Sequence, residues 1–170
     1  MRIAIILNGI SSRKNFFYRT FLPALRKNFT VEIFEPRTRY DAVGLASHAV
    51  DKHCDVILAA GGDGSVNQVV NGILQGRENH PDMPAVGIIP LGTGNDLPRG
   101  LNLKTDVSQL LTLLTGIKPT KIDIGRVNFT IENGLQHHQY FVNVADFGMG
   151  PEAVKRVMAT NRICGSAIAY

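Results

Sequence analysis

Two glycine-rich stretches carry the residue types that bind phosphate groups. The first is Gly61-Gly62-Asp63-Gly64, followed at once by Ser65. Glycines allow positive φ and bring bare backbone N–H groups against a ligand, and such a turn before a helix makes a site for anions. Asp63 is out of place beside a bare phosphate, because like charges repel. A divalent cation that joins the carboxylate to the phosphates would remove that conflict.

The spacing of this first stretch leaves an alternative open. It does not fit Gly-x-Gly-x-x-Gly, because Asn67 stands where the third glycine would be, and no Gly-Lys-Ser/Thr follows as in a Walker loop. The stretch could instead be a tight strand-to-helix turn in which Asp63 or Ser65 does no more than cap the helix. These residues alone do not decide between a binding site and a turn.

A second stretch of the same design favours a binding site. Residues 86–90 form a short apolar run, and Leu91-Gly92-Thr93-Gly94-Asn95-Asp96 follows with glycines, a hydroxyl and a carboxylate. A helix is expected to start at Asp96. In an open α/β sheet, the loops at the carboxyl ends of the strands face one crevice. Two such loops could enclose one phosphate chain.

The elements that must hold these loops alternate along the first part of the chain. Short apolar runs, typical of strands buried on both faces of a parallel sheet, occur at 3–7, 56–60 and 86–90, and a further strand is expected at 31–34. Helical spacing of apolar residues predicts helices over 16–28 and 41–53, from Ser65 as the capping residue, and between Asp106 and Gly116. The alternation predicts an α/β fold with a Rossmann-like parallel sheet and helices on both sides.

The pattern changes to a β-rich one after Lys118. Residues 120–131 and 139–145 are strand-like, and the connection between them contains Asn133-Gly134, a hairpin signal. The pair His137-His138 in this connection suggests a metal site, but a solvated loop tip is the better interpretation. Two strands alone cannot bury their apolar residues. We therefore expect more chain or a second copy to cover them, so that this chain alone self-associates or exposes an apolar patch.

Composition fits one soluble globular domain's worth of chain. The 170 residues are 44% hydrophobic and 19% charged. The apolar run at 3–7 is too short for a signal peptide, and no stretch approaches the length of a membrane span. Cys54 and Cys164 lie far apart in no metal-binding spacing, which favours free thiols in a reducing cytoplasm. A cytoplasmic protein is therefore expected.

The net charge of +4 is uneven along the chain. Residues 1–40 carry eight Lys and Arg against two Glu, so this segment has a charge of +6 and the remainder −2. A basic segment suits a polyphosphate ligand or an anionic membrane surface. Ordinary solvated helix faces explain Arg26 and Lys27 at least as well. No nucleic-acid partner is expected.

The two glycine motifs together carry a family resemblance. Gly-Gly-Asp-Gly-Ser-x-Asn at 61–67, followed by Pro-Leu-Gly-Thr-Gly-Asn-Asp at 90–96, resembles the catalytic domain of diacylglycerol kinases, a family that includes sphingosine, ceramide and bacterial lipid kinases. NAD kinases and phosphofructokinases share the first motif, whereas the second is far more specific. The family usually has Thr at position 65 and often Glu at 68. Ser65 keeps the hydroxyl here, and Gln68 loses a charge.

The resemblance implies an ATP-dependent lipid kinase that transfers the γ-phosphate to a lipid hydroxyl with Mg²⁺. Three carboxylates are the implied catalytic and metal-binding set, Asp63, Asp96 and the Asp123 of Asp-x-Gly. The implied ATP contacts are Asn8, Ser12, Thr38, Gly61, Gly62, Gly64, Ser65, Asn67, Gly92, Thr93, Gly94 and Asn95. The lipid would be diacylglycerol or a long-chain base, reached by peripheral contact with the inner membrane surface.

The resemblance also implies a division into two domains. Residues 1–118 would form the ATP-binding α/β domain, and 119–170 would start a β-sandwich substrate domain that this chain does not complete. A strand at 141–145, a glycine turn at 148–150 and a helix at 151–160 would belong to that second domain. The carboxylate general base would lie beyond Tyr170. Because loss of such a base costs about 10²–10⁴-fold in rate, the chain alone should turn over very slowly.

Two rival functions are open at this stage. An NAD kinase shares Gly-Gly-Asp-Gly, but the loop at 91–96 argues against it. A nucleotide-binding fragment without catalysis is supported by the missing base, whereas the intact acidic set argues against it. A homo-oligomer is a further expectation, because the hairpin needs a cover.

Overall fold

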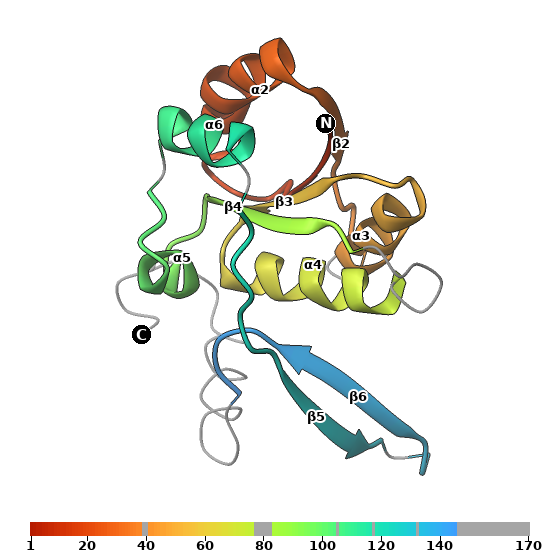
Figure 1. Ribbon diagram of the computed structural model, residues 1–170. Coiled ribbons are helices and arrows are strands. Elements are labelled where there is room, and N and C mark those ends of the chain that lie inside the picture. Colours follow the sequence, from red (N-terminus) through yellow and green to blue (C-terminus); the bar gives the residue numbers. More distant parts are fainter. Residues whose placement is uncertain (39–40, 77–82, 105, 117, 132, 146–170) are drawn as a thin grey trace.

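The computed structural model describes residues 1–38, 41–76, 83–104, 106–116, 118–131 and 133–145 (Figure 1). Its centre is a four-stranded parallel sheet with the strand order β2-β1-β3-β4. The strands are β1 (Arg2–Leu7), β2 (Thr30–Phe34), β3 (Val56–Gly61) and β4 (Ala85–Pro90). All of β3, and β1 from Ile3 onward, are buried, as their continuous apolar sequences predict. The predicted α/β fold is confirmed.

The register of the sheet brings three loops to one edge. β1 pairs with β3 so that Leu7 lies beside Ala60, and β3 pairs with β4 so that Gly61 lies beside Pro90. These residues are the last or next to last of their strands. The segments that follow β1, β3 and β4 therefore leave the sheet at the same level.

One face of the sheet is covered by helices from the start and the middle of the chain. The first cover is a nearly continuous helical segment of α1 (Lys14–Phe16), the π-helical η1 (Phe17–Phe21) and α2 (Leu22–Asn28), and the second is α6 (Val107–Thr115). Phe17, Phe21 and Leu25 pack on Ile3, Ile5 and Leu7, and Leu110 and Leu114 join the same cluster. Figure 1 shows α2 and α6 together on this side. As predicted, Asp106 caps α6 by accepting a hydrogen bond from the Ser108 N–H at 2.8 Å.

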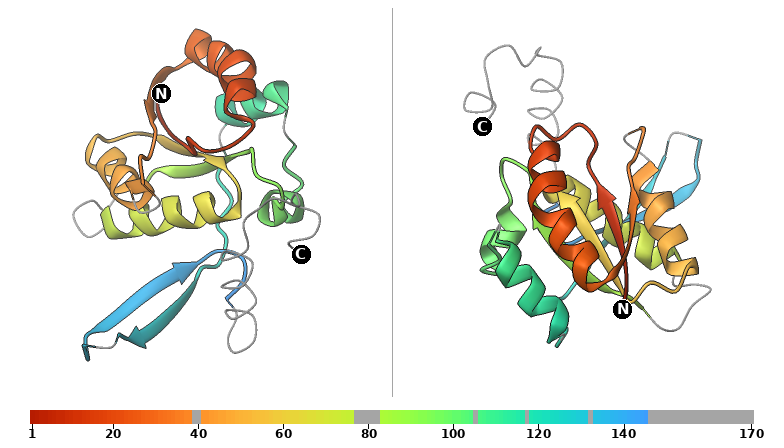
Figure 2. Two further views of the ribbon diagram at one scale, coloured as in Figure 1. Left: turned by 180° about the vertical axis from the view of Figure 1, so that it is seen from behind. Right: turned by 90° about the horizontal axis from the view of Figure 1, so that it is seen from above.

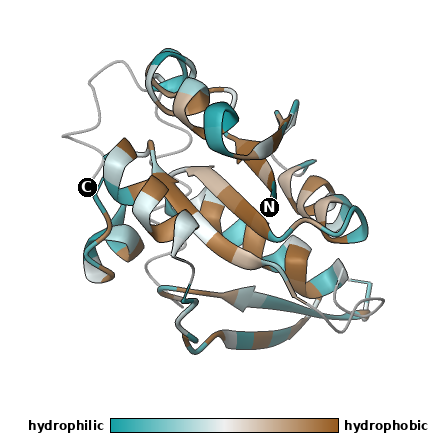
Figure 3. Ribbon diagram, turned by 45° about the horizontal axis from the view of Figure 1, so that its top comes forward, coloured by the Kyte–Doolittle hydropathy of each residue, from teal (hydrophilic) through white to brown (hydrophobic). Residues whose placement is uncertain are grey.

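Two longer helices cover the opposite face. They are α3 (Asp41–Asp51) and α4 (Asp63–Gly76), which lie side by side below the sheet in Figure 1 and in the left view of Figure 2. Glycine allows their close contact, because a Cβ on Gly72 would lie 2.1 Å from the Val43 carbonyl oxygen and 2.7 Å from the Ala46 Cβ. In Figure 3 the apolar residues gather on the strands and on the helix faces that meet them. The core is thus two clusters separated by the sheet.

The β-rich part forms a separate antiparallel hairpin of β5 (Gly125–Thr130) and β6 (Gln136–Phe141). The predicted hairpin exists, but its predicted strand bounds are wrong. The turn is tight: the Ile131 N–H donates to the Leu135 carbonyl, and Gly134 has a φ of +81°. The second strand therefore starts at Gln136, so His137 and His138 lie within β6 and not in a loop tip.

The outer parts of the two predicted strands are not paired. Gly125 pairs with Phe141, and neither 120–124 nor 142–145 belongs to a strand. The Phe141 ring covers Gly125, where a Cβ would lie 2.1 Å from the ring Cζ, so only glycine fits beneath this ring. The turn predicted at 148–150 and the helix at 151–160 lie outside the described residues, and so does Cys164.

Apolar side chains remain exposed along the hairpin and the segments that flank it. Phe129 is 41% exposed, Leu135 57% and Val144 76%. Val142, in contrast, packs against the core cluster on the α4 side of the sheet. None of the described helices has both the length and the apolar character needed to cross a membrane.

We predict that Gly72→Ala destabilises the fold by about 1–3 kcal/mol, because the new methyl group overlaps the Val43 carbonyl and forces α3 and α4 apart. Gly44→Ala, in α3, is the matched control. A Cβ there meets nothing within 4 Å, so the better helix propensity of alanine should stabilise the protein by about 0.5–1 kcal/mol. Urea unfolding measures both, and a Gly72→Ala protein as stable as the wild type would contradict the packing argument.

Candidate functional site

The candidate site lies at the topological switch point of the sheet. The chain leaves β1 toward β2 on one side, while β3 lies on the other side of β1. In open α/β sheets, ligands bind outside the carboxyl ends of the strands at this point. The loop after β1 begins at Asn8, whose N–H donates to the Ala60 carbonyl at 2.9 Å. The loops after β1 and β3 therefore start side by side.

The two glycine-rich loops touch through their backbones. A Cβ on Gly92 would lie 2.4 Å from the Gly62 Cα and 3.0 Å from the Gly62 nitrogen, so a side chain at position 92 would push the loops apart. Gly61 is equally confined, because its Cβ would lie 2.3 Å from the Ser65 Oγ. The expectation that the two loops face one crevice agrees with this contact.

The Asp63 carboxylate links the two loops. Its Oδ2 accepts a hydrogen bond from the Asp96 N–H at 3.1 Å, and its Oδ1 accepts one from the Leu97 N–H at 3.0 Å. Both donors lie in the first turn of α5 (Asp96–Gly100), which starts where the sequence predicted. Asp63 therefore does act as a cap, but of the neighbouring helix and not of its own.

The prediction that Ser65 caps α4 is wrong. α4 begins at Asp63, and the N–H groups of Ser65 and Val66 both donate to the Gly62 carbonyl, at 2.9 and 3.1 Å. Ser65 thus lies inside the first turn, with its hydroxyl against Gly61. The prediction misplaced the cap because Asp63 and Gly64 look like part of the glycine turn in the sequence, although both already have a helical backbone.

Asn95 holds the shape of the second glycine-rich loop, which follows β4. This residue has a left-handed backbone with φ of 54°, which asparagine tolerates better than most residues. Its side chain accepts a hydrogen bond from the Gly92 N–H at 3.1 Å and donates one to the Gly92 carbonyl at 2.7 Å. Thr93, between these residues, is exposed. The Asp96 carboxylate, also exposed, forms an ion pair with Arg99.

Two predicted ligand residues have features that packing does not explain. A Cβ on Gly64 would stand in open space, so the fold itself does not require glycine at this position. The Oδ1 of Asn67 is buried, yet it has no hydrogen-bond partner among the described residues. Buried polar atoms are normally paired. Both features fit a helix start that another molecule approaches closely.

The loop after β1 makes contacts that were not predicted from the sequence. The Ser11 hydroxyl donates to the Leu91 carbonyl at 3.1 Å, and the Arg13 Nη1 donates to the Pro90 carbonyl at 3.5 Å. These bonds tie the loop after β1 to the loop after β4, across the end of β3. Asn8 uses its Oδ1 within its own loop, as acceptor for the Ile10 N–H, and Ser12 is exposed. No local sequence signal marks Ser11 or Arg13 for this role.

Carboxylates with shifted pKa values lie after β2. Asp41 accepts hydrogen bonds from the Thr38 hydroxyl and from the N–H groups of Thr38 and Arg37, which lower the pKa of its carboxyl group. The Thr38 hydroxyl is thus engaged by the start of α3. Glu35 accepts from Lys14 and from the Tyr18 hydroxyl, and these two bonds lower the pKa of Glu35. Burial and the bond to Glu35 raise the pKa of Tyr18 to about 12.

The three predicted metal ligands are not gathered into a ready-made cluster. Asp63 meets the backbone of Asp96, whereas Asp123 is exposed in the extended segment before β5. Among the residues that the structure describes, no three His, Cys, Asp or Glu side chains lie close enough to hold a metal ion. The metal set therefore stays a prediction.

Known proteins place this fold and these loops in a family. The family model of the diacylglycerol kinase catalytic domain matches residues 2–127. Diacylglycerol kinases of Staphylococcus haemolyticus and Staphylococcus aureus are 34% and 35% identical to this chain in alignments of 151 residues that cover 86% of it. A solved diacylglycerol kinase from Bacillus anthracis, 25% identical, covers 84% of this chain with a TM-score of 0.60.

The chain therefore belongs to the diacylglycerol kinase catalytic domain family, as its motifs predicted. It spans less than half the length of these relatives: 42% and 44% of the two staphylococcal proteins and 48% of the solved Bacillus chain.

Proposed function

We propose that this chain carries the ATP-binding part of a diacylglycerol kinase-like enzyme, which transfers the γ-phosphate of ATP to a lipid hydroxyl with Mg²⁺. The observation that supports this most directly is the backbone contact of Gly62 with Gly92, which brings the two glycine-rich loops together beside Asp63. Phosphoryl transfer depends on positioning and charge stabilisation more than on covalent chemistry by the protein. Two apposed loops of bare N–H groups suit that need.

Backbone groups would bind the phosphates in this proposal. α4 has 14 residues, and in its first turn the N–H groups of Ser65 and Val66 already donate to the Gly62 carbonyl, so those of Asp63 and Gly64 would be the ones to meet a phosphate. The helix dipole favours negative charge at the same place. Gly61, Gly62 and Gly64 would approach the phosphates from one loop, and Gly92, Thr93 and Gly94 from the other. The remaining proposed ATP contacts are Asn8, Ser12, Thr38, Ser65, Asn67 and Asn95.

The carboxylates of Asp63, Asp96 and Asp123 would hold the magnesium ion. Each oxygen of Asp63 accepts one backbone hydrogen bond, which leaves lone pairs for a cation or for its water molecules. Mg²⁺ commonly keeps several waters and takes only one or two carboxylates directly, so a gathered three-carboxylate cluster is not required. When bound, Mg²⁺ would neutralise phosphate oxygens of ATP.

The lipid acceptor is proposed from the relatives' name and from the charge of the chain. The relatives at 34–35% identity are named diacylglycerol kinase. The basic segment 1–40 suits peripheral contact of a cytoplasmic protein with the anionic inner membrane surface. We further propose that residues from 119 onward open a second domain that completes the lipid site and supplies the general base. The exposed apolar residues of the hairpin would be covered there or in a homo-oligomer.

We expect Mg²⁺ to strengthen ATP binding by the wild-type protein and this gain to be lost in Asp63→Asn. A unit charge pair at 4 Å is worth about 4 kcal/mol at an effective dielectric constant of 20, so the loss should exceed tenfold in affinity. Metal-free ATP should bind Asp63→Asn at least as well as the wild type, because a repulsive charge is gone. Calorimetry with and without magnesium measures all four affinities.

Asp106→Asn is the matched control for this experiment, because Asp106 also accepts a backbone N–H at a helix start. It should keep the full magnesium gain. Equal ATP affinity of the wild type with and without magnesium would contradict the proposed metal role.

We expect the complete gene product, offered labelled ATP with diacylglycerol, a sphingoid base or NAD, to place the label on a lipid. The reason is the specific loop at 91–96, which the alternative of an NAD kinase does not explain. Thin-layer separation of the products measures the outcome. Label on NAD alone would establish the NAD kinase, and ATP binding without transfer to any acceptor would leave a non-catalytic nucleotide-binding protein.

A further inference from the structure

Asn71 makes an unusual contact between α4 and the β5–β6 hairpin. It is only 5% exposed, and its carboxamide binds both backbone groups of one residue, Tyr140. The Oδ1 accepts the Tyr140 N–H at 2.9 Å, and the Nδ2 donates to the Tyr140 carbonyl at 2.8 Å. A second bond from Nδ2 reaches the Asn67 carbonyl within α4, also at 2.8 Å. The side chain is thereby fixed to the helix and to the hairpin at once.

This contact takes the place of a neighbouring strand on the edge of β6 that faces away from β5. Tyr140 lies opposite Arg126 in the antiparallel ladder, but both of its backbone groups bind Asn71 and so point away from β5. They belong to the free edge of β6, where unpaired backbone groups would otherwise be left. The Asn71 carboxamide pairs with them as a residue of a third strand would.

The clamp lies at the end of the hairpin that faces the proposed site. The next residue, Phe141, pairs with Gly125, two positions after Asp123. Val142 then packs against the core cluster that contains Val66 of α4, and Leu97 of α5 packs against the same cluster. The end of the hairpin that follows Asp123 is thus fixed against α4, the helix that starts at Asp63.

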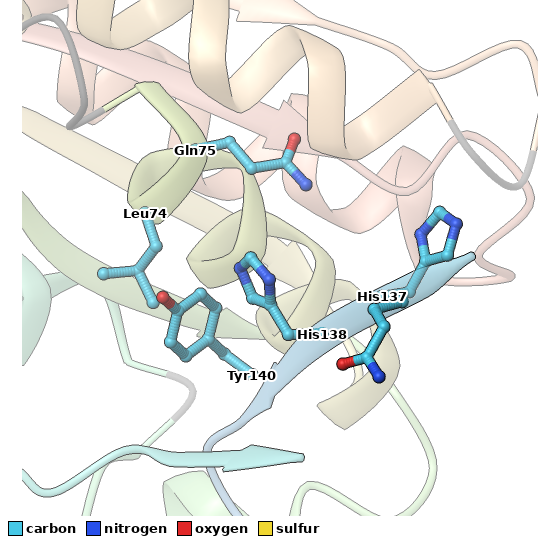
Figure 4. Close-up of a pocket in the computed structure, with 6 residues that line it drawn as sticks. Leu74, Gln75, His137, His138 and Tyr140 are labelled. Atoms are coloured by element: carbon cyan, nitrogen blue, oxygen red, sulfur yellow. The ribbon is translucent and has the colours of Figure 1, made fainter. Parts of the chain in front are cut away.

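Toward the hairpin turn, the contact opens into a pocket. This pocket has a volume of about 310 Å³ and is lined by Leu74, Gln75, Gln136, His137, His138 and Tyr140 (Figure 4). Close packing therefore does not continue along α4 and β6. The hydrogen bonds of Asn71 hold the hairpin just before the two elements separate.

We infer that Asn71 is a positioning residue, which fixes the hairpin and the Asp123 ahead of it relative to Asp63 at the start of α4. The inference rests on the proposed function, in which Asp63 and Asp123 act together with Mg²⁺. Asn71 itself touches neither ATP nor metal in this role. Mutation of a residue that orients metal ligands without touching the metal typically lowers metal affinity by about 10–100-fold.

The test compares ATP binding with and without Mg²⁺ in Asn71→Asp and Asn71→Ala. Asn71→Asp keeps the shape but cannot donate to the two carbonyls, and Asn71→Ala removes the clamp without adding charge. We expect both to bind metal-free ATP like the wild type and to lose about tenfold or more of the gain from Mg²⁺. Gln75→Ala, one turn further along α4 in the pocket wall, is the control and should keep the full gain.

Amide hydrogen exchange of the full chain supplies a readout that needs no nucleotide. We expect faster exchange over 139–142 in both Asn71 variants, with β1 and β3 as protected as in the wild type. Protection of β1 and β3 also shows that each variant is folded.

The outcomes separate this inference from the proposed function. Unchanged exchange over 139–142 would overturn the clamp. Faster exchange with an intact magnesium gain would overturn the positioning role alone, because the hairpin would then move without affecting the metal. A wild type without any magnesium gain would overturn the proposed metal role and the positioning role with it.

Discussion

The backbone contact between Gly62 and Gly92 is the constraint on which the candidate site depends. It exists because the parallel register brings the ends of β3 and β4 level, so that Gly61 lies beside Pro90. A side chain at position 92 would force the loops apart. Asp63 then spans the same gap and caps α5 with both carboxylate oxygens. Glycine and aspartate in these motifs therefore build the site before any ligand is bound.

Asp63 can serve two purposes, the capping of α5 and the proposed binding of a cation. Its two oxygens already cap α5, and the neighbouring Gly64 leaves open space at the start of α4, because a Cβ there would meet nothing within 4 Å. The hydrogen bonds from the Asp96 and Leu97 N–H groups fix the orientation of the carboxylate. The same bonds would hold it ready for a cation, so the structural and the proposed catalytic roles support each other.

Much of the fold was predictable, because its signals are local. Buried parallel strands require continuous apolar runs, and Asn133-Gly134 marks the hairpin turn. The contacts that organise the site are not local: Asp63 reaches Leu97 across 34 positions, and Asn71 reaches Tyr140 across 69. Both use side chains that bind backbone groups, and a backbone group leaves no mark in the sequence. The predicted strand bounds of the hairpin were wrong for a related reason. A strand ends where its pairing with the neighbouring strand ends, and that pairing is not visible in the strand's own sequence.

In our proposal, one phosphate chain binds between the two glycine-rich loops. Backbone amide chemical shifts of the isotope-labelled protein, followed during titration with Mg²⁺ and ATP, test this most directly. We expect the amides of Gly61, Gly62 and Gly64 and those of Gly92 and Gly94 to shift together, with one dissociation constant. Shifts confined to one loop, or concentrated in the pocket between α4 and β6, would contradict it.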